Sequence, residues 1–269
     1  MILLFFSTQR KKLPTSRTGD SPLSALGHRQ AVETGKFLDN WLYENGFTTD
    51  DITWMSSPFL RCLETSNDAL NSFRQLKVDT LPILPEYSVF EWDGHDGEWH
   101  KDLPSLEERK NYFPRLDINY ESLFIPTLPE ARDKFQQRCQ DAIDKLDQRH
   151  PFKGGQVLVI VTHAAGAIML SKVLTGGELH DVTPAGPCSI YGLTRTADSG
   201  NTWKLDKHDK PNGFNGYTNH LSKQGSTTVP WNSFGDGKLK FYTGPANSRF
   251  APSLEEQERQ RKFGVPRSS

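Results

Sequence analysis

The chain has little cysteine, and what it has forms neither a pair nor a cluster. Among its 269 residues only Cys62, Cys139 and Cys188 are cysteines, far apart in the sequence and outside any metal-site spacing. An odd number of scattered thiols is typical of a reducing compartment. We therefore expect no disulfide framework and predict a cytoplasmic or nuclear protein.

Long hydrophobic runs and an excess of charge of one sign are also lacking. No stretch approaches the roughly 20 apolar residues that a transmembrane helix needs. The first apolar residues, 2–6, precede the basic residues 10–12, whereas a signal peptide has its charge first. The formal net charge of −1 gives no whole-chain attraction to nucleic acid or an anionic membrane. We expect neither as a partner, and any phosphate must be recognised by local cationic groups.

What the sequence does contain is an apolar strand that runs directly into a histidine. Residues 157–161 are five apolar, mostly β-branched residues, which predicts a central parallel strand covered on both faces. His163 follows, and small residues then lead into an apolar helix from Ala167. This order places His163 at the carboxyl edge of the sheet, where open α/β sheets bind ligands. The pattern leaves two interpretations open: His163 bonds locally, as a helix cap or to a carbonyl, or it does chemistry.

Strands and helices alternate along most of the chain, which predicts an α/β fold: a three-layer sandwich with a mostly parallel central sheet. Residues 93–129 lack a clear period and are expected to form an insertion over the sheet edge. Residues 1–205 are predicted to form one domain, and 206–269 an irregular, partly disordered extension. The expected strands are 2–6, 52–56, 78–84, 157–161, 188–195 and 203–205, and the expected helices are 25–42 with Ser24 as N-cap, 59–73 with Pro58 in the first turn, 129–148 and 167–174.

Two more side chains are candidates for chemistry. Arg61 falls in the first turn of a helix after a short strand, where free N–H groups and the helix dipole favour a phosphate. Glu91 stands between Phe90 and Trp92, whose apolar surface would raise its pKa towards the range of a proton donor. Glu86 is the competing acid. The alternatives are a solvated surface arginine and surface carboxylates.

Four motifs occur in order along the chain: Asp20-Ser-Pro-Leu-Ser-Ala-Leu-Gly-His-Arg-Gln-Ala31, Ser56-Ser-Pro-Phe-Leu-Arg-Cys-Leu-Glu-Thr65, Phe90-Glu-Trp92 and Val161-Thr-His-Ala-Ala-Gly166. This order resembles that of the histidine phosphatase superfamily, also called phosphoglycerate mutase-like. The resemblance extends over about the first 195 residues. The spacing from Glu86 to Phe90-Glu91-Trp92, together with the acidic insertion, is most similar to the branch of the ubiquitin-associated, SH3-containing tyrosine phosphatases.

The resemblance implies hydrolysis of a phosphate monoester, with transfer of the phosphoryl group to a histidine and then to water. It implies that Arg61 and His163 bind the phosphoryl oxygens and that Glu91 protonates the leaving oxygen. Arg10 matches a further basic residue of some members. No metal or other cofactor is implied, because cationic side chains neutralise the developing charge. The substrate would be a phosphorylated small molecule or a phosphoprotein.

The resemblance fails at the end of the first strand. Where the superfamily has Arg-His-Gly, with the histidine as nucleophile, this chain has Phe6 and Ser7. A serine hydroxyl is nearly fully protonated near neutral pH, and no base stands beside Ser7 in the sequence. Because losing a nucleophile removes several orders of magnitude of rate, we expect a very poor phosphatase or none.

Two explanations of this departure stay open. The protein is a pseudophosphatase that keeps a phosphate pocket for binding or scaffolding, or the first dozen residues are not the natural start of the enzyme. The residues from Leu13 to Leu23 favour the second slightly, because they resemble members with a longer loop after Arg-His-Gly. Residues 212–222 also weakly resemble the post-domain segment of members that serve in transcription-factor assemblies. The extension is therefore a candidate for binding a protein partner.

Overall fold

The structure, a computed structural model, describes residues 1–6, 20–93, 103–150, 154–179, 185–195, 203–205 and 217–218, with backbone alone for 2–6 and 217–218. Within these residues, seven strands form one sheet in the order β3-β2-β4-β1-β5-β6, with β7 also paired to β5. The strands are β1 (Ile2–Phe6), β2 (Ile52–Ser56), β3 (Leu84–Pro85), β4 (Val157–Thr162), β5 (Ile190–Thr194), β6 (Lys204–Leu205) and β7 (Tyr217–Thr218). The helices are α1 (Ala25–Glu44), α2 (Leu60–Asn71), α3 (Leu106–Lys110), α4 (Arg132–Arg149) and α5 (Ala164–Thr175), with short 3-10 turns η1 (Thr49–Asp51) and η2 (Tyr87–Val89).

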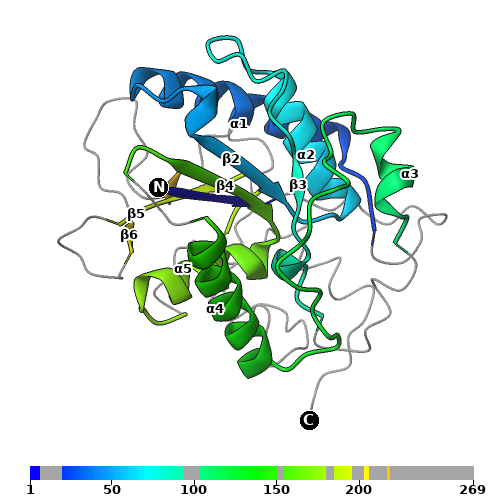
Figure 1. The fold of residues 1–269 in the computed structure, drawn as a ribbon, viewed down its shortest axis with the longest axis vertical. Helices are drawn as coiled ribbons and strands as arrows, with labels where there is room; N and C mark the ends of the chain where they lie inside the picture. Colours follow the sequence, from blue (N-terminus) through cyan, green and yellow to red (C-terminus); the bar gives the residue numbers. More distant parts are fainter. Residues whose placement is uncertain are drawn as a thin grey trace, which may run out of the picture.

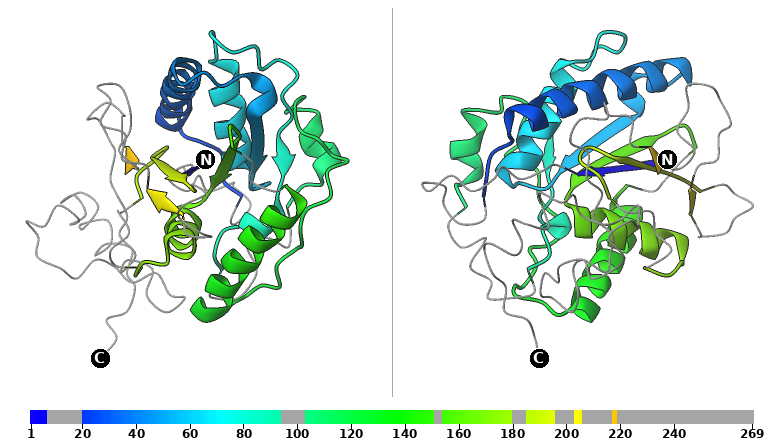
Figure 2. Two further views of the ribbon diagram at one scale, coloured as in Figure 1. Left: turned by 60° about the vertical axis from the view of Figure 1, so that its left-hand side comes forward. Right: turned by 180° about the vertical axis from the view of Figure 1, so that it is seen from behind.

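The helices lie on both faces of the sheet. Helices α1 and α2 cover one face, and α4 and α5 cover the other (Figures 1 and 2). Strands β3, β2, β4 and β1 are parallel, whereas β5 pairs antiparallel with β1 and carries β6 and β7 antiparallel on its other edge. The predicted α/β fold with a mostly parallel central sheet is therefore confirmed.

Strand β4 explains why the sheet is covered on both sides. Its apolar side chains alternate between two cores, because successive side chains of a strand point to opposite faces. Leu158 and Ile160 belong to the core shared with α4 and α5. Val157, Val159 and Val161 belong to the core shared with α1 and α2. An uninterrupted apolar run is what a strand buried on both faces requires.

Helices α1 and α2 pack closely over one face. Ser24 caps α1 as predicted, with its hydroxyl accepting a hydrogen bond from the Gly27 N–H at 3.0 Å. A Cβ on Gly35 would lie 2.2 Å from the carbonyl oxygen of Ala69, so only glycine permits this approach to α2. Asp39 caps the turn after α2 by accepting hydrogen bonds from three successive backbone N–H groups, those of residues 74–76.

Some predicted boundaries were wrong. The strand expected over 78–84 is reduced to Leu84 and Pro85, and Val78 and Leu81 lie instead in turns with buried side chains. Pro58 precedes the cap of α2 instead of standing in its first turn. At Val78 and Leu81 the apolar side chains are buried without a strand ladder, so strand propensity alone does not decide the conformation there.

The described part of the predicted insertion, residues 103–129, lies beside the β3 edge of the sheet. Ile83 and Leu116 form a parallel bridge there, which extends the edge. Phe113 is buried in the core under α1 and α2, whereas Tyr112 is exposed. The other described aromatics contact α4 and its neighbours, since Tyr120 packs against the opposite core and Phe124 lies under the Lys145 ammonium. These side chains thus complete the cores of the domain.

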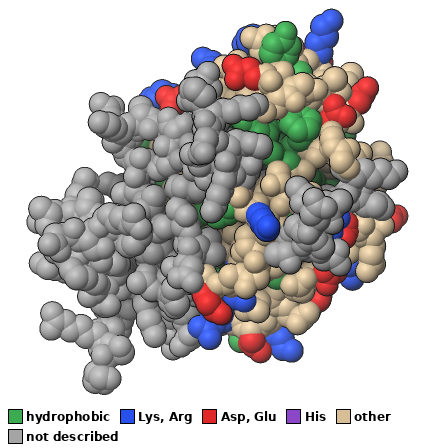
Figure 3. Space-filling view, turned by 90° about the vertical axis from the view of Figure 1, so that its left-hand side faces the viewer, with side chains coloured by type: hydrophobic (Ala, Val, Ile, Leu, Met, Phe, Trp, Pro, Cys, Tyr) green, Lys and Arg blue, Asp and Glu red, His purple; other side chains and the backbone are tan. Residues whose placement is uncertain are grey.

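On the face shown in Figure 3, acidic and basic side chains of the described residues are intermixed. None of the described helices has the length and apolar composition needed to cross a membrane. Of the predicted C-terminal extension, the structure describes the pairing of β7 with β5, and the other residues from 206 onward lie outside the described ranges.

Candidate functional site

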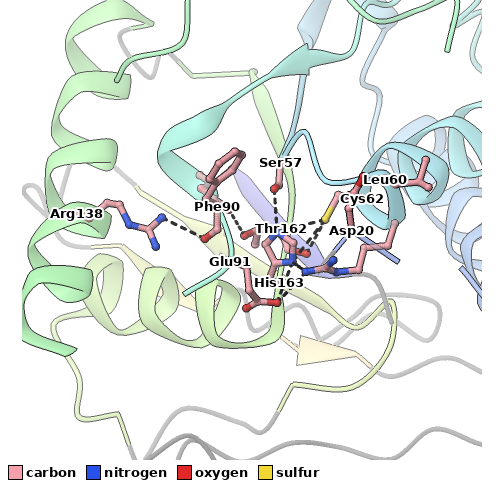
Figure 4. Close-up of polar contacts among 11 residues, drawn as sticks. Asp20, Ser57, Leu60, Cys62, Phe90, Glu91, Arg138, Thr162 and His163 are labelled. Atoms are coloured by element: carbon pink, nitrogen blue, oxygen red, sulfur yellow. Dashed lines mark hydrogen bonds and ion pairs between the residues drawn. The ribbon is translucent and has the colours of Figure 1, made fainter. Parts of the chain in front are cut away.

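Three side chains that the sequence singled out meet near the carboxyl ends of β2 and β4, and Figure 4 shows two of them, Glu91 and His163. Arg61 Nη2 lies 2.9 Å from His163 Nδ1 and 3.0 Å from Glu91 Oε2. His163 Nδ1 lies 3.2 Å from the same carboxylate oxygen. Arg61 and His163 are each 1% exposed, and the Glu91 side chain is 16% exposed. The site is therefore a cationic pair covered by one carboxylate.

His163 owes its position to the parallel pairing of β2 and β4. Ser56 is in register with Val161, and the Ser57 N–H donates to the Val161 carbonyl at 2.8 Å, which continues the ladder beyond β2. Ser57 Oγ thereby comes within 2.8 Å of His163 Nε2. The imidazole makes no capping hydrogen bond to α5, although His163 is its N-cap residue. The interpretation of His163 as a mere helix cap is therefore wrong.

Phe59 forms a platform under both cationic groups. The Arg61 guanidinium lies over its ring at 4.6 Å, and the His163 ring meets it edge to face at 5.1 Å and 85°. A cation over an aromatic face is attracted by the ring quadrupole, most strongly when both are desolvated. Phe59 is buried and stands directly before α2. It therefore restricts Arg61 and His163 to one arrangement.

Glu91 is positioned by the backbone on its amino-terminal side. Arg138 of α4, a buried side chain, donates to the carbonyls of Ser88 and Phe90 at 2.8 and 3.1 Å. The Thr162 hydroxyl donates to the Val89 carbonyl at 2.8 Å. These bonds attach the segment before Glu91 to α4 and to β4. The carboxylate consequently reaches the cations from a fixed backbone.

The start of α2 is held from outside the helix. Asp20 Oδ1 accepts from the Leu60 N–H at 2.7 Å, while its other oxygen accepts from Arg109 at 2.7 Å. The Glu64 carboxylate accepts from the Leu23 N–H at 2.5 Å. One of the helix N–H groups expected to face a phosphate is thus already used by Asp20. Arg61 remains as the cationic group that α2 contributes.

Comparison with known proteins decides the family. The family model of the histidine phosphatase superfamily (branch 1) matches residues 7–208, well over half of the chain. The chain belongs to this superfamily. A phosphatase of Bacillus subtilis (strain 168), named PhoE and described as uncharacterized, is 30% identical over 159 residues, which is 59% of this chain and 67% of the relative.

Solved structures of histidine phosphatases share the fold. The ecdysone phosphate phosphatase of Bombix mori, in complex with tungstate, superposes with a TM-score of 0.56 at 18% identity, covering 82% of this chain and 97% of that one. A mycobacterial glucosyl-3-phosphoglycerate phosphatase gives a TM-score of 0.50 at 20% identity, covering 76% and 96%. At these identities the likeness is one of fold.

The electrostatics of Glu91 in this histidine phosphatase chain differ from the prediction. Burial alone would raise its pKa, as expected from the neighbouring aromatics. The charges and hydrogen bonds of His163 and Arg61 outweigh burial and lower the pKa of the carboxyl from 4.5 to about 2. The prediction of a raised pKa was wrong, because the cationic partners are distant in sequence. In the ligand-free site Glu91 is ionised.

The electrostatics of His163 complement those of Glu91. Burial lowers the pKa of the imidazole, but Cys62 and Glu91 raise it by more than burial and Arg61 lower it, so the pKa lies above its ordinary value. Cys62 Sγ lies 3.7 Å from Nε2 and 3.9 Å from Nδ1. The charged form of His163, which attracts a phosphate, is therefore favoured more than in an ordinary histidine.

Glu86, the competing acid, is a structural residue. It is fully buried, and it accepts hydrogen bonds from the Ser88 N–H at 3.0 Å, the Tyr120 hydroxyl at 2.7 Å and the Ser122 hydroxyl at 2.5 Å. These bonds close the chain around η2 and tie it to the insertion. Between Glu86 and Glu91, only Glu91 contacts the cationic pair.

Sequence reasoning missed Ser57, Phe59 and Arg138 as parts of the site. Ser57 and Phe59 lie inside the motif that contains Arg61, so their place in that motif was a usable signal. Arg138 interrupts the apolar stripe of α4 and is buried, and a charged residue in such a stripe points to a specific partner. Its partner Glu130 lies eight residues earlier and accepts from the Arg138 Nε at 2.9 Å.

Two residues named in the sequence analysis, Arg10 and Ser7, are not tested by the structure. Both lie outside the described residues. Within the described ranges no group of three or more His, Cys, Asp or Glu side chains is arranged to hold a metal ion. A separate hollow between α2 and the insertion is lined by Leu60, Tyr112 and Phe113 among others, and none of the three site residues lines it.

Proposed function

We propose that the site formed by Arg61, Glu91 and His163 binds the phosphoryl group of a phosphate monoester. The observation that carries this proposal is the convergence of a guanidinium and a histidine within 2.9 Å at the carboxyl edge of the sheet. A buried guanidinium beside a histidine with a raised pKa is costly to desolvate unless an anion accompanies it. In the structure that anion is Glu91, and a phosphoryl group supplies more negative charge and more acceptor oxygens.

Binding requires that the phosphoryl group replaces the Glu91 carboxylate. The guanidinium of Arg61 has five N–H donors in a planar fork, which suits two phosphate oxygens at once. His163 Nδ1 points into the same space, since it already lies near the Glu91 oxygen. Phe59 keeps both groups in place during the exchange. Recognition is thus electrostatic and independent of a metal ion.

The exchange also prepares Glu91 for proton donation. Once a phosphate dianion takes Arg61 and His163, the carboxyl loses its cationic partners and gains a negative neighbour, so its pKa rises. A protonated Glu91 would donate its proton to the ester oxygen as the phosphorus–oxygen bond breaks. The lowered pKa comes from the pairing of Glu91 with His163 and Arg61 and does not argue against this role.

Turnover requires a nucleophile that forms a bond to phosphorus while the ester bond breaks. The superfamily resemblance assigns that role to a histidine after the first strand, where this chain has Ser7. We therefore propose phosphomonoester hydrolase chemistry by family membership, with a rate that is very low or zero in this chain. The second candidate function, favoured by the same serine, is a non-catalytic module that binds a phosphorylated ligand, as a pseudophosphatase or a subunit of a larger assembly.

The narrower family placement remains a prediction. The spacing of Glu86 and Glu91 suggests the ubiquitin-associated, SH3-containing tyrosine phosphatase branch, and the relatives named above carry other printed activities. The ligand is proposed as a phosphorylated small molecule or a phosphoprotein.

The test uses inorganic phosphate and tungstate as ligands and p-nitrophenyl phosphate as substrate. Both anions should raise the melting temperature of the wild-type protein, and the rise should disappear in Arg61→Ala and His163→Ala. Arg195→Ala is the matched control, since Arg195 forms an ion pair with Asp147 and stacks on Trp203 away from the site. No anion-dependent stabilisation of well-folded wild-type protein would refute the phosphate site. Binding without turnover would identify the non-catalytic module.

A further inference from the structure

The two nitrogens of His163 have different surroundings. Nδ1 faces the anion site, with Arg61 Nη2 at 2.9 Å and Glu91 Oε2 at 3.2 Å. Nε2 faces the end of β2, where Ser57 Oγ lies at 2.8 Å. The described charged and titratable groups that face the ring are therefore Arg61, Glu91 and Cys62, the last by its sulfur at 3.7 Å from Nε2. Which nitrogen carries the proton of the neutral ring follows from these partners.

Arg61 identifies Nδ1 as an acceptor in the neutral ring. A guanidinium is a donor only, so its hydrogen bond to Nδ1 requires a lone pair on that nitrogen. The remaining proton of the neutral ring is then on Nε2, where the Ser57 hydroxyl oxygen accepts it. When the ring gains a second proton, that proton goes to Nδ1, which then donates to Glu91 or to a bound anion. The Nε2–H bond to Ser57 is the same in both forms.

We propose that Ser57 is a positioning residue whose hydroxyl accepts a hydrogen bond from His163 Nε2–H, so that Nδ1 is the nitrogen that exchanges its proton at the anion site. Ser57 is suited to this task because it is fully buried and its N–H is bonded to the Val161 carbonyl at 2.8 Å. The backbone that carries this oxygen is therefore anchored to β4, on the same strand end as His163. Cys62 is a weaker partner, since its thiol already donates to the Thr162 carbonyl at 3.5 Å.

The inference deepens the proposed phosphate site and rests on it for its functional meaning. If the neutral ring turned over, or carried its single proton on Nδ1, a ring N–H group would face the Arg61 N–H donors. Arg61 would then have no acceptor on the ring. A ring held by Ser57 presents either a lone pair to Arg61 or, once charged, a donor to phosphate. Anion affinity then follows the charge of His163 without a change in ring orientation.

The first test is an NMR measurement on the ligand-free wild-type protein. Long-range nitrogen–proton spectra of the His163 ring, assigned by the loss of its signals in His163→Gln, show which nitrogen keeps its proton at alkaline pH. We expect Nε2 to stay protonated and Nδ1 to lose its proton. A neutral ring protonated on Nδ1 would overturn the proposal. Because no anion is added, this result is independent of whether the protein binds phosphate.

The second test follows inorganic phosphate affinity as a function of pH in Ser57→Ala. Without the hydroxyl, charged His163 loses a hydrogen bond, and phosphate binding should weaken about ten-fold near neutral pH. The pH above which phosphate affinity falls should also be lower than in the wild type. Ser57→Thr keeps the hydroxyl and should restore the wild-type profile. Ser56→Ala is the control, because Ser56 is equally buried but its hydroxyl donates to the Ser57 carbonyl. A Ser57→Ala profile identical to wild type would refute the positioning role.

Discussion

Glu86 and Glu91 lie five residues apart on the same segment, yet their carboxylates have opposite kinds of partner. Glu86 is enclosed by neutral donors, among them the Tyr120 hydroxyl at 2.7 Å. Glu91 is paired with the cations Arg61 and His163, at 3.0 and 3.2 Å. A carboxylate held by neutral donors stabilises the fold, whereas one held by two cations competes with any anion for them. The pair therefore separates a structural from a functional acid.

Glu91→Gln should bind inorganic phosphate more tightly while any hydrolysis of p-nitrophenyl phosphate falls. The amide removes the negative charge that occupies the cations, and it cannot donate the acidic proton. We expect an affinity gain of about ten-fold, as for removal of a competing partially exposed ion pair. Isothermal titration calorimetry measures the affinity. Glu86→Gln, the matched control, should reduce stability without a gain in affinity, and weaker phosphate binding by Glu91→Gln would contradict the competition.

The stability of the protein should decrease in acid through Glu91. Its folded-state pKa is lowered from 4.5 to about 2, so its contribution is complete above pH 4.5 and is lost as pH falls towards 2. The contribution is on the order of 3 kcal/mol. Urea unfolding of wild type and Glu91→Gln over this pH range measures it. The difference between the two proteins should shrink with falling pH, and a difference independent of pH would refute the pairing.

Phe59→Leu should weaken anion binding more than it weakens the fold. Leucine keeps much of the buried volume but removes the ring beneath Arg61 and beside His163. Loss of a desolvated cation–π contact is worth about 2 kcal/mol, which corresponds to roughly thirty-fold in affinity. Phe73→Leu is the control, since Phe73 packs edge to face on Trp54 in the same core. Equal anion affinity in the two variants would exclude the platform role.

Gly35→Ala should destabilise the packing of α1 on α2. The new methyl group would lie 2.2 Å from both the Ala69 carbonyl oxygen and the Ser72 hydroxyl, so the helices must separate. Overpacking of this kind costs about 1 to 3 kcal/mol, measurable as a lower melting temperature. At Gly154 a Cβ would meet nothing within 4 Å, so Gly154→Ala is the matched control. Unchanged stability of Gly35→Ala would show that α1 and α2 can move apart without a loss of stability, which would contradict the prediction.

Several features follow from local sequence alone. The apolar run of β4 predicts a strand covered on both faces, because no other residue pattern pays for burying both sides of a strand. Ser24 predicts the start of α1, because its hydroxyl satisfies an N–H that the helix leaves free. The prediction of a strand over 78–84 was wrong. Most of this segment forms no strand ladder, although the side chains of Val78 and Leu81 are buried.

By itself the sequence determined the α/β order of the elements. It also singled out Arg61, Glu91 and His163 as the candidate site residues. Only the tertiary structure decided how these groups act on one another. The sign of the Glu91 pKa shift depends on Arg61, 30 residues away, and on His163, which is 102 residues from Arg61. Electrostatic interactions depend on distance in space, and a linear chain does not reveal it. The proposed role of Ser57 likewise rests on a contact between residues far apart in the sequence, that of its hydroxyl with His163 Nε2.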